Sequence, residues 1–252
     1  MDLTVSPPKG LKKFKTKQPP YSHMQGWLPC RALLTNPSGG GKGICMLNLA
    51  LKFWKSTFSR IYLFSPTASL DHTWDTLKDH IRNTLKVEDS EQVFFDTFDE
   101  GAITKILDTQ RRMVAYQKKH TPHEPILQIL ILVDDFGSDS TVMKHNKILD
   151  KLYTQGRHIF VSTVISQQRW MMASSTQRSQ ATLVLYGKPR SNLDWQKFSE
   201  ENSALAGGQK NLDEMLKIAT REPYGFLTLD LLQQDPNKRW LKNFETYLIP
   251  GG

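Results

Sequence analysis

The sequence predicts an α/β fold in which helices cover both faces of a mainly parallel sheet. Apolar runs typical of strands alternate with helical stretches through most of the chain, which is the pattern of a doubly wound sheet. A glycine-rich segment separates the first strand from the first helix, and a later apolar strand ends in two aspartates. The last stretch alternates apolar and polar residues around a turn, which predicts a C-terminal β-ribbon.

The individual elements follow from their apolar spacing, taken in chain order. Short apolar runs predict strands at residues 27–34, 60–64, 92–95, 126–133, 158–165 and 182–186. Apolar residues at helical spacing predict helices at residues 44–55, 71–83, 99–118 and 141–154. The run at 126–133 is almost continuously apolar, as a central buried strand requires. Alternating stretches at 224–232 and 239–248 flank Asp235-Pro236-Asn237 and predict the ribbon.

The composition fits one globular domain with a sizeable core. The 252 residues are 38% hydrophobic and 23% charged. No apolar run is long enough to span a bilayer, so no membrane partner is expected. The N-terminus lacks the apolar segment of a secretory signal. Two cysteines, Cys30 and Cys45, are too few for a disulfide framework and are expected to be buried thiols in a reducing compartment.

Residues 1–25 are expected to form a flexible basic arm ahead of one folded domain at residues 26–252. The arm contains five lysines and four prolines, and the whole chain has a net charge of +8. Basic arms commonly neutralise phosphates on nucleic acid. A solvated tail that only aids solubility is the alternative.

The glycine-rich segment has the layout of a phosphate-binding P-loop, which is strand, glycine-rich turn, lysine and helix. It consists of Asn36, Pro37, Ser38, Gly39, Gly40, Gly41, Lys42 and Gly43, with Ile44 opening the helix. Successive backbone N–H groups in such a loop cradle phosphates. The lysine, here Lys42, reaches the β- and γ-phosphates. We therefore expect ATP to bind here, and residues 26–252 to form a P-loop ATPase domain.

Two positions depart from the pattern G-x-x-x-x-G-K-[ST]. Asn36 replaces the first glycine, which is a mild change because Asn tolerates left-handed backbone angles. Gly43 replaces the serine or threonine whose hydroxyl binds Mg²⁺. Whether the protein hydrolyses ATP or only binds it therefore depends on Gly43.

Two carboxylates follow the central apolar strand. An acid at the carboxyl end of a strand near the P-loop holds Mg²⁺, directly or through water, and we assign this role to Asp134. The next acid orients the attacking water, and we assign that role to Asp135. The alternative is that Asp134-Asp135-Phe136-Gly137 only ends the strand in a turn.

The strand after the two acids also ends in polar residues. Its tip carries two glutamines, of which Gln168 rather than Gln167 is expected to sense the γ-phosphate or the attacking water. The alternative is that both glutamines are solvated amides in a loop. Arg157, at the other end, is a candidate arginine finger for a neighbouring subunit, or else a salt-bridge or DNA-facing charge. Arg169 and Arg178 are rival fingers.

Five segments in this order resemble a known family. They are P-S-G-G-G-K-G, I-Y-L-F-S-P-T from Ile61, I-L-V-D-D-F, G-R-H-I-F-V-S-T-V-I-S-Q-Q and A-T-R-E-P-Y-G-F-L. Together they resemble the DNA-packaging ATPases of large double-stranded DNA viruses, of the poxvirus, Maverick and virophage type. These proteins belong to the FtsK–HerA group of P-loop motors. The resemblance covers residues 27–230.

The resemblance implies a P-loop NTPase core with an extra strand between the P-loop strand and the acid-ending Walker B strand. It implies a homo-oligomeric ring that uses ATP and Mg²⁺ to drive double-stranded DNA into a capsid, with a capsid or portal component as partner. The resemblance also implies that the protein is found in the host-cell cytoplasm or a virus factory, with the nucleus as the alternative, and is not secreted. Lys42, Asp134, Asp135 and Gln168 match the family's positions, whereas Gly43 does not.

Three functions remain open at this point. The first is an ATP-driven translocase with weak hydrolysis. The second is a nucleotide-binding pseudo-ATPase or structural ring subunit that has lost turnover through Gly43. The third is a small-molecule or nucleoside kinase, which is disfavoured because the sequence shows neither an arginine-rich lid nor an acceptor-site signature.

Overall fold

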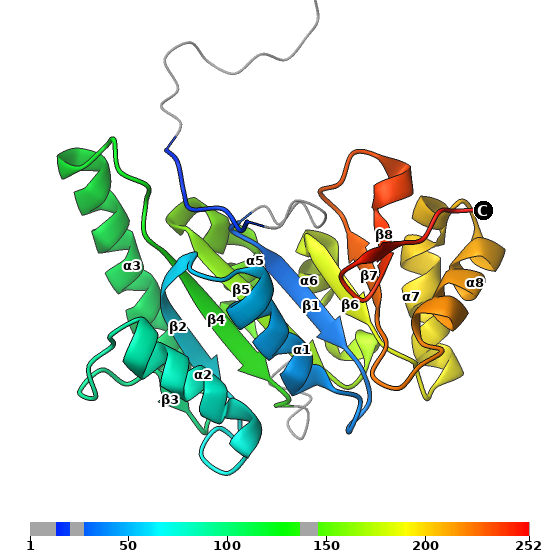
Figure 1. Ribbon diagram of the computed structural model, residues 1–252, viewed down its shortest axis with the longest axis horizontal. Helices are drawn as coiled ribbons and strands as arrows, with labels where there is room; N and C mark the ends of the chain where they lie inside the picture. The colour runs from blue at the N-terminus through cyan, green and yellow to red at the C-terminus, as the bar shows by residue number, and fades with distance from the viewer. Residues whose placement is uncertain (1–13, 21–27, 137–145, 252) are drawn as a thin grey trace, which may run out of the picture.

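The computed structural model describes residues 14–20, 28–136 and 146–251. Its named strands form one nine-stranded sheet in the order β3-β2-β4-β5-β1-β6-β7-β8-β9 (Figure 1). The parallel strands are β1 (Arg31–Thr35), β2 (Phe58–Phe64), β3 (Phe94–Phe95), β4 (Gln128–Asp134), β5 (Val161–Gln167) and β6 (Leu183–Tyr186). The antiparallel strands at one edge are β7 (Leu227–Asp230), β8 (Trp240–Lys242) and β9 (Thr246–Tyr247).

The predicted extra strand is confirmed, because β5 lies between the P-loop strand β1 and the acid-ending strand β4. The register pairs Thr35 with Gln167 and Asp134 with Ser166. The carboxyl ends of β1, β5 and β4 therefore meet at one edge of the sheet. In open α/β sheets this is the edge where ligands bind.

Helices cover both faces of the sheet, as predicted. Figure 1 shows α1 (Lys42–Asn48) in front of the sheet and α5 (Lys147–Gln155) behind it. Met46 of α1 and Leu149 of α5 are fully buried. The P-loop helix continues beyond α1 as a π-helical turn, η1 (Leu49–Phe53).

The remaining helices and turns connect these strands. They are η2 (His72–Trp74), α2 (Asp75–Asp79), η3 (His80–Thr84), α3 (Glu100–His120), η4 (Gly156–Ile159), η5 (Trp170–Met172), α6 (Ser175–Gln180), α7 (Asn192–Asn202), η6 (Ser203–Ala206), α8 (Gln209–Ala219) and η7 (Pro236–Lys238). Within the part of the chain that the structure describes, no helix is both long and apolar enough to cross a bilayer.

The central strands form the core. Every residue of β4 and of β5 is buried, which explains why β4 reads as a continuous apolar run. Both cysteines are free and buried as expected, and burial raises the pKa of the Cys30 thiol to about 12.

Some predicted boundaries shift for local reasons. The strand predicted at 158–165 begins at Val161, because η4 precedes it and Phe160 adopts a φ of 58°. The helix predicted at 141–154 is present as α5, although residues 141–145 lie outside the described part. Helix α7 carries no clear apolar stripe, because it buries polar side chains that include Asp194 and Asn202, and the apolar pattern missed it.

Part of the expected N-terminal arm contacts the domain. The backbone N–H of Ile126 donates to the Lys15 carbonyl at 2.8 Å. The Gln18 side chain exchanges two hydrogen bonds of 2.9 Å with the backbone of Leu28. Residues 14–20 thus lie against the domain, and the rest of the arm is outside the described residues.

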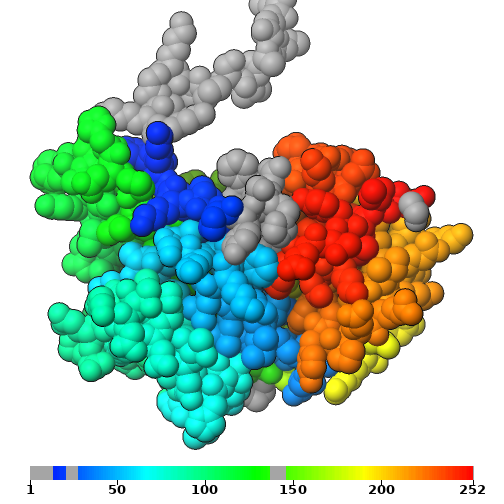
Figure 2. Space-filling model, viewed as in Figure 1, coloured from blue at the N-terminus to red at the C-terminus, as the bar shows by residue number. Residues whose placement is uncertain are grey.

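The predicted C-terminal ribbon is present and packs beside the P-loop helix. Figure 2 shows the C-terminal strands, in red, next to the segment that follows the P-loop, in blue. The ring centroids of Phe53 in η1 and Phe244 lie 4.3 Å apart. The ribbon therefore closes one side of the pocket at the P-loop.

Candidate nucleotide-binding site

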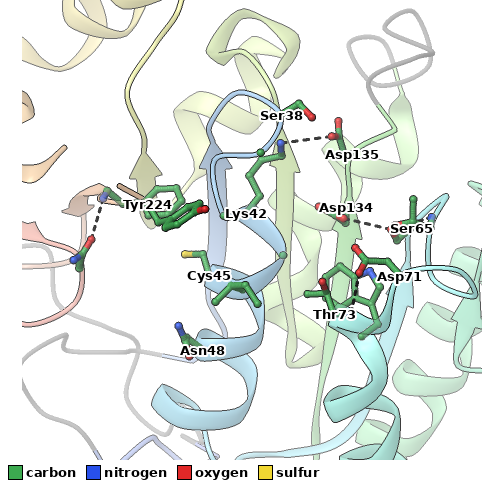
Figure 3. A pocket seen from close by; sticks show the side chains of 18 of the residues that line it. Ser38, Lys42, Cys45, Asn48, Ser65, Asp71, Thr73, Asp134, Asp135 and Tyr224 are labelled. Carbon is green, nitrogen blue, oxygen red and sulfur yellow. Dashed lines mark hydrogen bonds and ion pairs between the residues drawn. The ribbon is translucent and has the colours of Figure 1, made fainter. Parts of the chain in front are cut away.

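An open pocket of about 980 Å³ lies beside the P-loop (Figure 3). It is lined by residues from five separate parts of the chain, including Ser38, Lys42, Thr73, Asp134, Asp135, Tyr224 and Phe244. The pocket is at the carboxyl edge of β1 and β4, where the fold predicts a ligand site.

The glycines of the P-loop are required by its backbone. Gly39 and Gly41 have φ values of 75° and 83°, and Gly41 is the N-cap of α1. These left-handed angles favour glycine because any Cβ would be strained there. The N–H of Gly40 donates to the Pro37 carbonyl at 3.0 Å and closes a tight turn. The loop thus has the curved backbone that phosphate binding needs.

Asn36 has a different role from the one expected. It is not among the described residues with positive φ, so tolerance of left-handed angles does not explain it. Its side chain is buried, and Nδ2 donates to the Gly40 carbonyl at 2.6 Å. A Cβ on Gly40 or on Gly187 would lie 2.3 or 2.1 Å from that side chain. The amide fills the space between two glycines and braces the loop.

Lys42 is buried at the end of the loop. Its Nζ lies 3.5 Å from a carboxylate oxygen of Asp135 and donates to the Pro37 carbonyl at 3.4 Å. Both contacts are long for charge-assisted interactions. An incoming phosphate can therefore replace them at little cost.

Asp134 ends β4 and is buried. Its carboxylate accepts hydrogen bonds from the hydroxyls of Ser166 and, at 3.3 Å, Ser65. Burial raises the pKa of Asp134 above its ordinary value, and the bond from Ser166 partly opposes this shift. A cation bound here would favour the ionised carboxylate.

Asp135 meets Lys42 and Gln168 in space. Its backbone has a φ of 47°, a left-handed angle that Asp adopts more readily than most residues. Gln168 Nε2 donates to both carboxylate oxygens of Asp135 at 3.1 Å. Lys42 and Gln168, from two distant segments, thus both contact Asp135.

The two glutamines occupy different environments. Ser166 faces Asp134, so its neighbour Gln167 points to the opposite face of the sheet. Gln167 is buried there, and its amide has no hydrogen-bond partner among the described residues. Gln168 instead contacts Asp135, which lines the pocket.

The oxygen atoms at the pocket fit Mg²⁺. Asp134 supplies a carboxylate, and Ser65 and Thr73 supply hydroxyls from the pocket walls. The described residues contain no cluster of three His, Cys, Asp or Glu side chains that could hold a metal alone. Mg²⁺ in nucleotide sites is usually held by one or two carboxylates together with phosphates and water.

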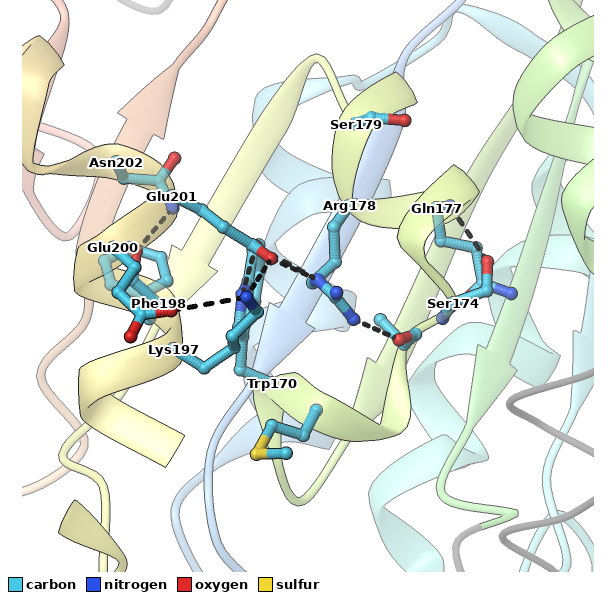
Figure 4. Close-up of polar contacts among 12 residues, drawn as sticks. Trp170, Ser174, Gln177, Arg178, Ser179, Lys197, Phe198, Glu200, Glu201 and Asn202 are labelled. Carbon is cyan, nitrogen blue, oxygen red and sulfur yellow. Dashed lines mark hydrogen bonds and ion pairs between the residues drawn. The ribbon is translucent and has the colours of Figure 1, made fainter. Parts of the chain in front are cut away.

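The three arginines singled out as fingers differ in position. Arg157 is exposed in η4, at the amino end of β5, and so lies at the edge of the sheet opposite its own P-loop. Arg169 is exposed directly after Gln168. Arg178 pairs with Glu201 at 3.0 Å, and Trp170 donates to the same carboxylate (Figure 4). Arg178 is therefore held in a structural network.

Three residues beside the P-loop were missed by the sequence analysis. A guanidinium nitrogen of Arg190 donates to the Ser38 carbonyl at 3.3 Å. Tyr224, with a φ of 62° and 69% exposed, places its ring 3.0 Å from where a Cβ on Gly41 would lie. Thr73 lies beside Gly43. Tyr224 falls in the quoted A-T-R-E-P-Y-G-F-L stretch, whereas no pattern marks Arg190 or Thr73.

The family description "Poxvirus A32 protein" matches residues 27–223 of the sequence. The chain belongs to the poxvirus A32 family. No curated protein matches it by sequence.

Solved structures share the fold of this A32-family protein at low sequence identity. The genome packaging NTPase B204 from Sulfolobus turreted icosahedral virus 2, in complex with AMP, matches with a TM-score of 0.55 and 17% identity over 83% of this chain and 100% of that one. B204 from Sulfolobus turreted icosahedral virus, described as the DNA-packaging ATPase, gives 0.55 and 15% over 82% and 95%. The pCW3 conjugation coupling protein TcpA with ATPγS gives 0.50 and 13% over 79% and 57%.

Replacing Asn36 tests the brace in the P-loop. Asn36→Ala should lower the free energy of unfolding by about 1–3 kcal/mol, because the Gly40 carbonyl loses its donor and a buried gap remains. Urea unfolding measures this change. Asn36→Asp is the matched control for shape, since it keeps the volume but cannot donate. Unfolding of Asn36→Ala at the parent's urea midpoint would rule out the brace.

Proposed function

We propose that this protein is an ATPase that translocates double-stranded DNA during packaging into a viral capsid. The observation that carries the proposal is the meeting of Lys42, Asp135 and Gln168 at the P-loop pocket, on a sheet with β5 inserted between β1 and β4. Membership of the poxvirus A32 family supports the DNA-packaging role. The fold shared with the B204 packaging NTPases agrees with it.

In the proposed reaction the phosphates of ATP lie on the glycine-rich loop. Lys42 moves from Asp135 to the β- and γ-phosphates, because phosphate offers a stronger charge-assisted partner than a contact of 3.5 Å. Asp135 is then free to orient water for in-line attack on the γ-phosphate. Bound Mg²⁺ would offset the phosphate charge, with Asp134 as its carboxylate partner.

Gln168 would couple the nucleotide to the rest of the chain. It donates to Asp135 and begins the connection from β5 to η5. Loss of the γ-phosphate would change the position of Asp135 and so of this connection. Such a link between hydrolysis and movement is what a motor needs.

We further propose a homo-oligomeric ring that engages double-stranded DNA and a capsid or portal component, in the host-cell cytoplasm or a virus factory. In a ring, Arg157 would act on the neighbouring subunit's nucleotide, since it lies far from the pocket of its own subunit.

A nucleotide-binding pseudo-ATPase is the second candidate, and one observation favours it. Gly43 has no hydroxyl for Mg²⁺ in the position where the P-loop pattern supplies one. Under this alternative the ring would bind ATP tightly and move no DNA.

Displacement of a third strand from a triplex tests the translocase directly. The protein should release the third strand from a linear duplex in an ATP-dependent manner, and Lys42→Ala should not. Tight ATP binding without any displacement would favour the pseudo-ATPase.

Lys42 should contribute strongly to nucleotide affinity. Lys42→Ala should weaken ATP binding by about 1.5–3 kcal/mol, or roughly 10- to 150-fold in Kd, because a charge-assisted contact to phosphate is lost. Calorimetric titration measures it. Lys55→Ala, which removes an exposed lysine outside the pocket, is the control. Equal affinity of the Lys42 variant and the parent would refute the P-loop assignment.

The two aspartates should have separable effects. Asp135→Asn should keep nucleotide and Mg²⁺ binding but slow single-turnover hydrolysis, because the carboxylate that orients water is lost. Asp134→Asn should weaken the Mg²⁺ dependence of binding. Titrating Mg²⁺ at fixed ATP compares the variants, and equal losses of Mg²⁺ affinity would contradict the division of roles.

Removal of the first part of the arm should reduce DNA binding selectively. Deletion of residues 2–13 removes three lysines and leaves Lys15 and Gln18, which contact the domain. The slope of log affinity for duplex DNA against log salt should fall by roughly 0.9 for each lysine that contacts phosphate. ATP affinity serves as the internal control. An unchanged slope would leave the arm as a solubility tail.

A further inference from the structure

The position that lacks a metal-binding hydroxyl is covered by a different segment of the chain. If Gly43 carried a Cβ, that atom would lie 3.4 Å from Thr73 Cγ2 and 3.7 Å from the Trp74 ring. Thr73 and Trp74 belong to η2, which follows β2 and packs against α1. The Thr73 side chain therefore lies beside position 43, where the P-loop pattern has a serine or threonine.

Thr73 is oriented by a local cap. The Asp71 side chain accepts the Thr73 backbone N–H at 2.8 Å and begins the turn of η2. Figure 3 shows Asp71 and Thr73 near Ser65 and Asp134, on the other side of α1 from Tyr224. Thr73 is half-buried and lines the pocket together with Gly43 and Asp134.

One rotamer step brings the hydroxyl to Gly43. The methyl and the hydroxyl of threonine share one Cβ, and staggered χ1 wells are about 120° apart. Rotation by one well places Oγ1 where Cγ2 now lies, facing the space above Gly43. Thr73 is half-buried, and the rotation gives up the hydrogen bond between its side chain and the Asp71 carboxylate.

We propose that the Thr73 hydroxyl supplies, in the nucleotide-bound protein, the Mg²⁺ ligand that Gly43 lacks. This inference rests on the proposed ATP site. A hydroxyl from η2 takes the place of the missing P-loop hydroxyl, and the Asp134 carboxylate lies near it in the same pocket. Hard oxygen donors of this kind are those Mg²⁺ prefers.

Other hydroxyls in the pocket are less well placed. Ser65 is fully buried and donates to Asp134 at 3.3 Å, whereas Thr73 is half-buried and lies beside Gly43. Figure 3 shows Ser38 near Asp135, at the outer end of the loop, while Thr73 lies beside α1. The loop itself separates Ser38 from Gly43. Thr73 Cγ2, in contrast, would lie only 3.4 Å from a Cβ on Gly43.

The test measures binding of Mn²⁺, as a spectroscopic substitute for Mg²⁺, to the complex with ADP by electron paramagnetic resonance. Thr73→Val keeps the shape and removes the hydroxyl, and it should weaken Mn²⁺ binding roughly 10- to 100-fold, in the range seen when groups that support a metal site are removed. Thr73→Ser keeps the hydroxyl and should bind Mn²⁺ like the parent. Thermal unfolding of each variant verifies that it folds.

A second substitution makes the test reciprocal. Gly43→Ser fits, because its Cβ meets Thr73 at an ordinary contact distance of 3.4 Å. Placed in the Thr73→Val background, it should restore Mn²⁺ affinity by returning a hydroxyl to the P-loop. In the parent background the gain should be smaller, since a ligand is already present.

Two results would overturn the inference. Thr73→Val could bind Mn²⁺ as tightly as the parent while ADP affinity is normal. Asp71→Asn could weaken Mn²⁺ binding while Thr73→Val leaves it unchanged, which would assign the ligand to the carboxylate instead. Failure of the parent itself to bind ADP would refute the proposed function, and this is distinguishable because the Thr73 variants test only the metal.

Discussion

Insertion of β5 between β1 and β4 is the constraint on which the site depends. Parallel pairing on both sides fixes the register, so that the ends of three strands meet at one edge. Asp134 then lies opposite Ser166, and Gln168 follows directly beside Asp135. Because side chains alternate between the faces of the sheet, a shift of β5 by one residue would turn Ser166 away from Asp134.

The two departures from the P-loop pattern are met by residues far along the chain. Asn36 needs a partner without a side chain, and Gly187, after β6, provides that space. Gly43 leaves a gap that η2 covers with Thr73 and Trp74. In both cases a residue that departs from the P-loop pattern contacts a distant segment of the chain. The effect of each departure therefore depends on tertiary packing as well as on the loop sequence.

The parts of the fold that rest on local pattern were predictable. Apolar runs identified the central strands, and the glycine-rich turn and the acid pair identified the edge where Lys42, Asp134 and Asp135 lie. The choice of Gln168 over Gln167 agrees with the alternation of side chains along β5. Helix α7 was missed because its buried face includes Asp194, which accepts two backbone N–H groups of η5. Such burial of polar groups removes the apolar stripe.

The residues that sequence reasoning missed share one property. Arg190 and Tyr224 reach the P-loop from loops that follow β6 and α8, and no local pattern records a contact between distant segments. The contacts of the N-terminal arm were also not predictable from local sequence, because Lys15 and Gln18 bond to Ile126 and Leu28, which are distant in the chain or lie outside the arm. Composition identified its basic character but not where its contacts begin.

The most direct measurement of the central claim is steady-state ATP hydrolysis with and without duplex DNA, over a range of Mg²⁺ concentrations. A DNA-packaging ATPase with glycine at position 43 should turn over slowly alone and faster with duplex DNA, and Lys42→Ala should abolish both rates. Tight ATP binding without hydrolysis at any Mg²⁺ concentration, with DNA present, would contradict the motor and leave a nucleotide-binding ring subunit.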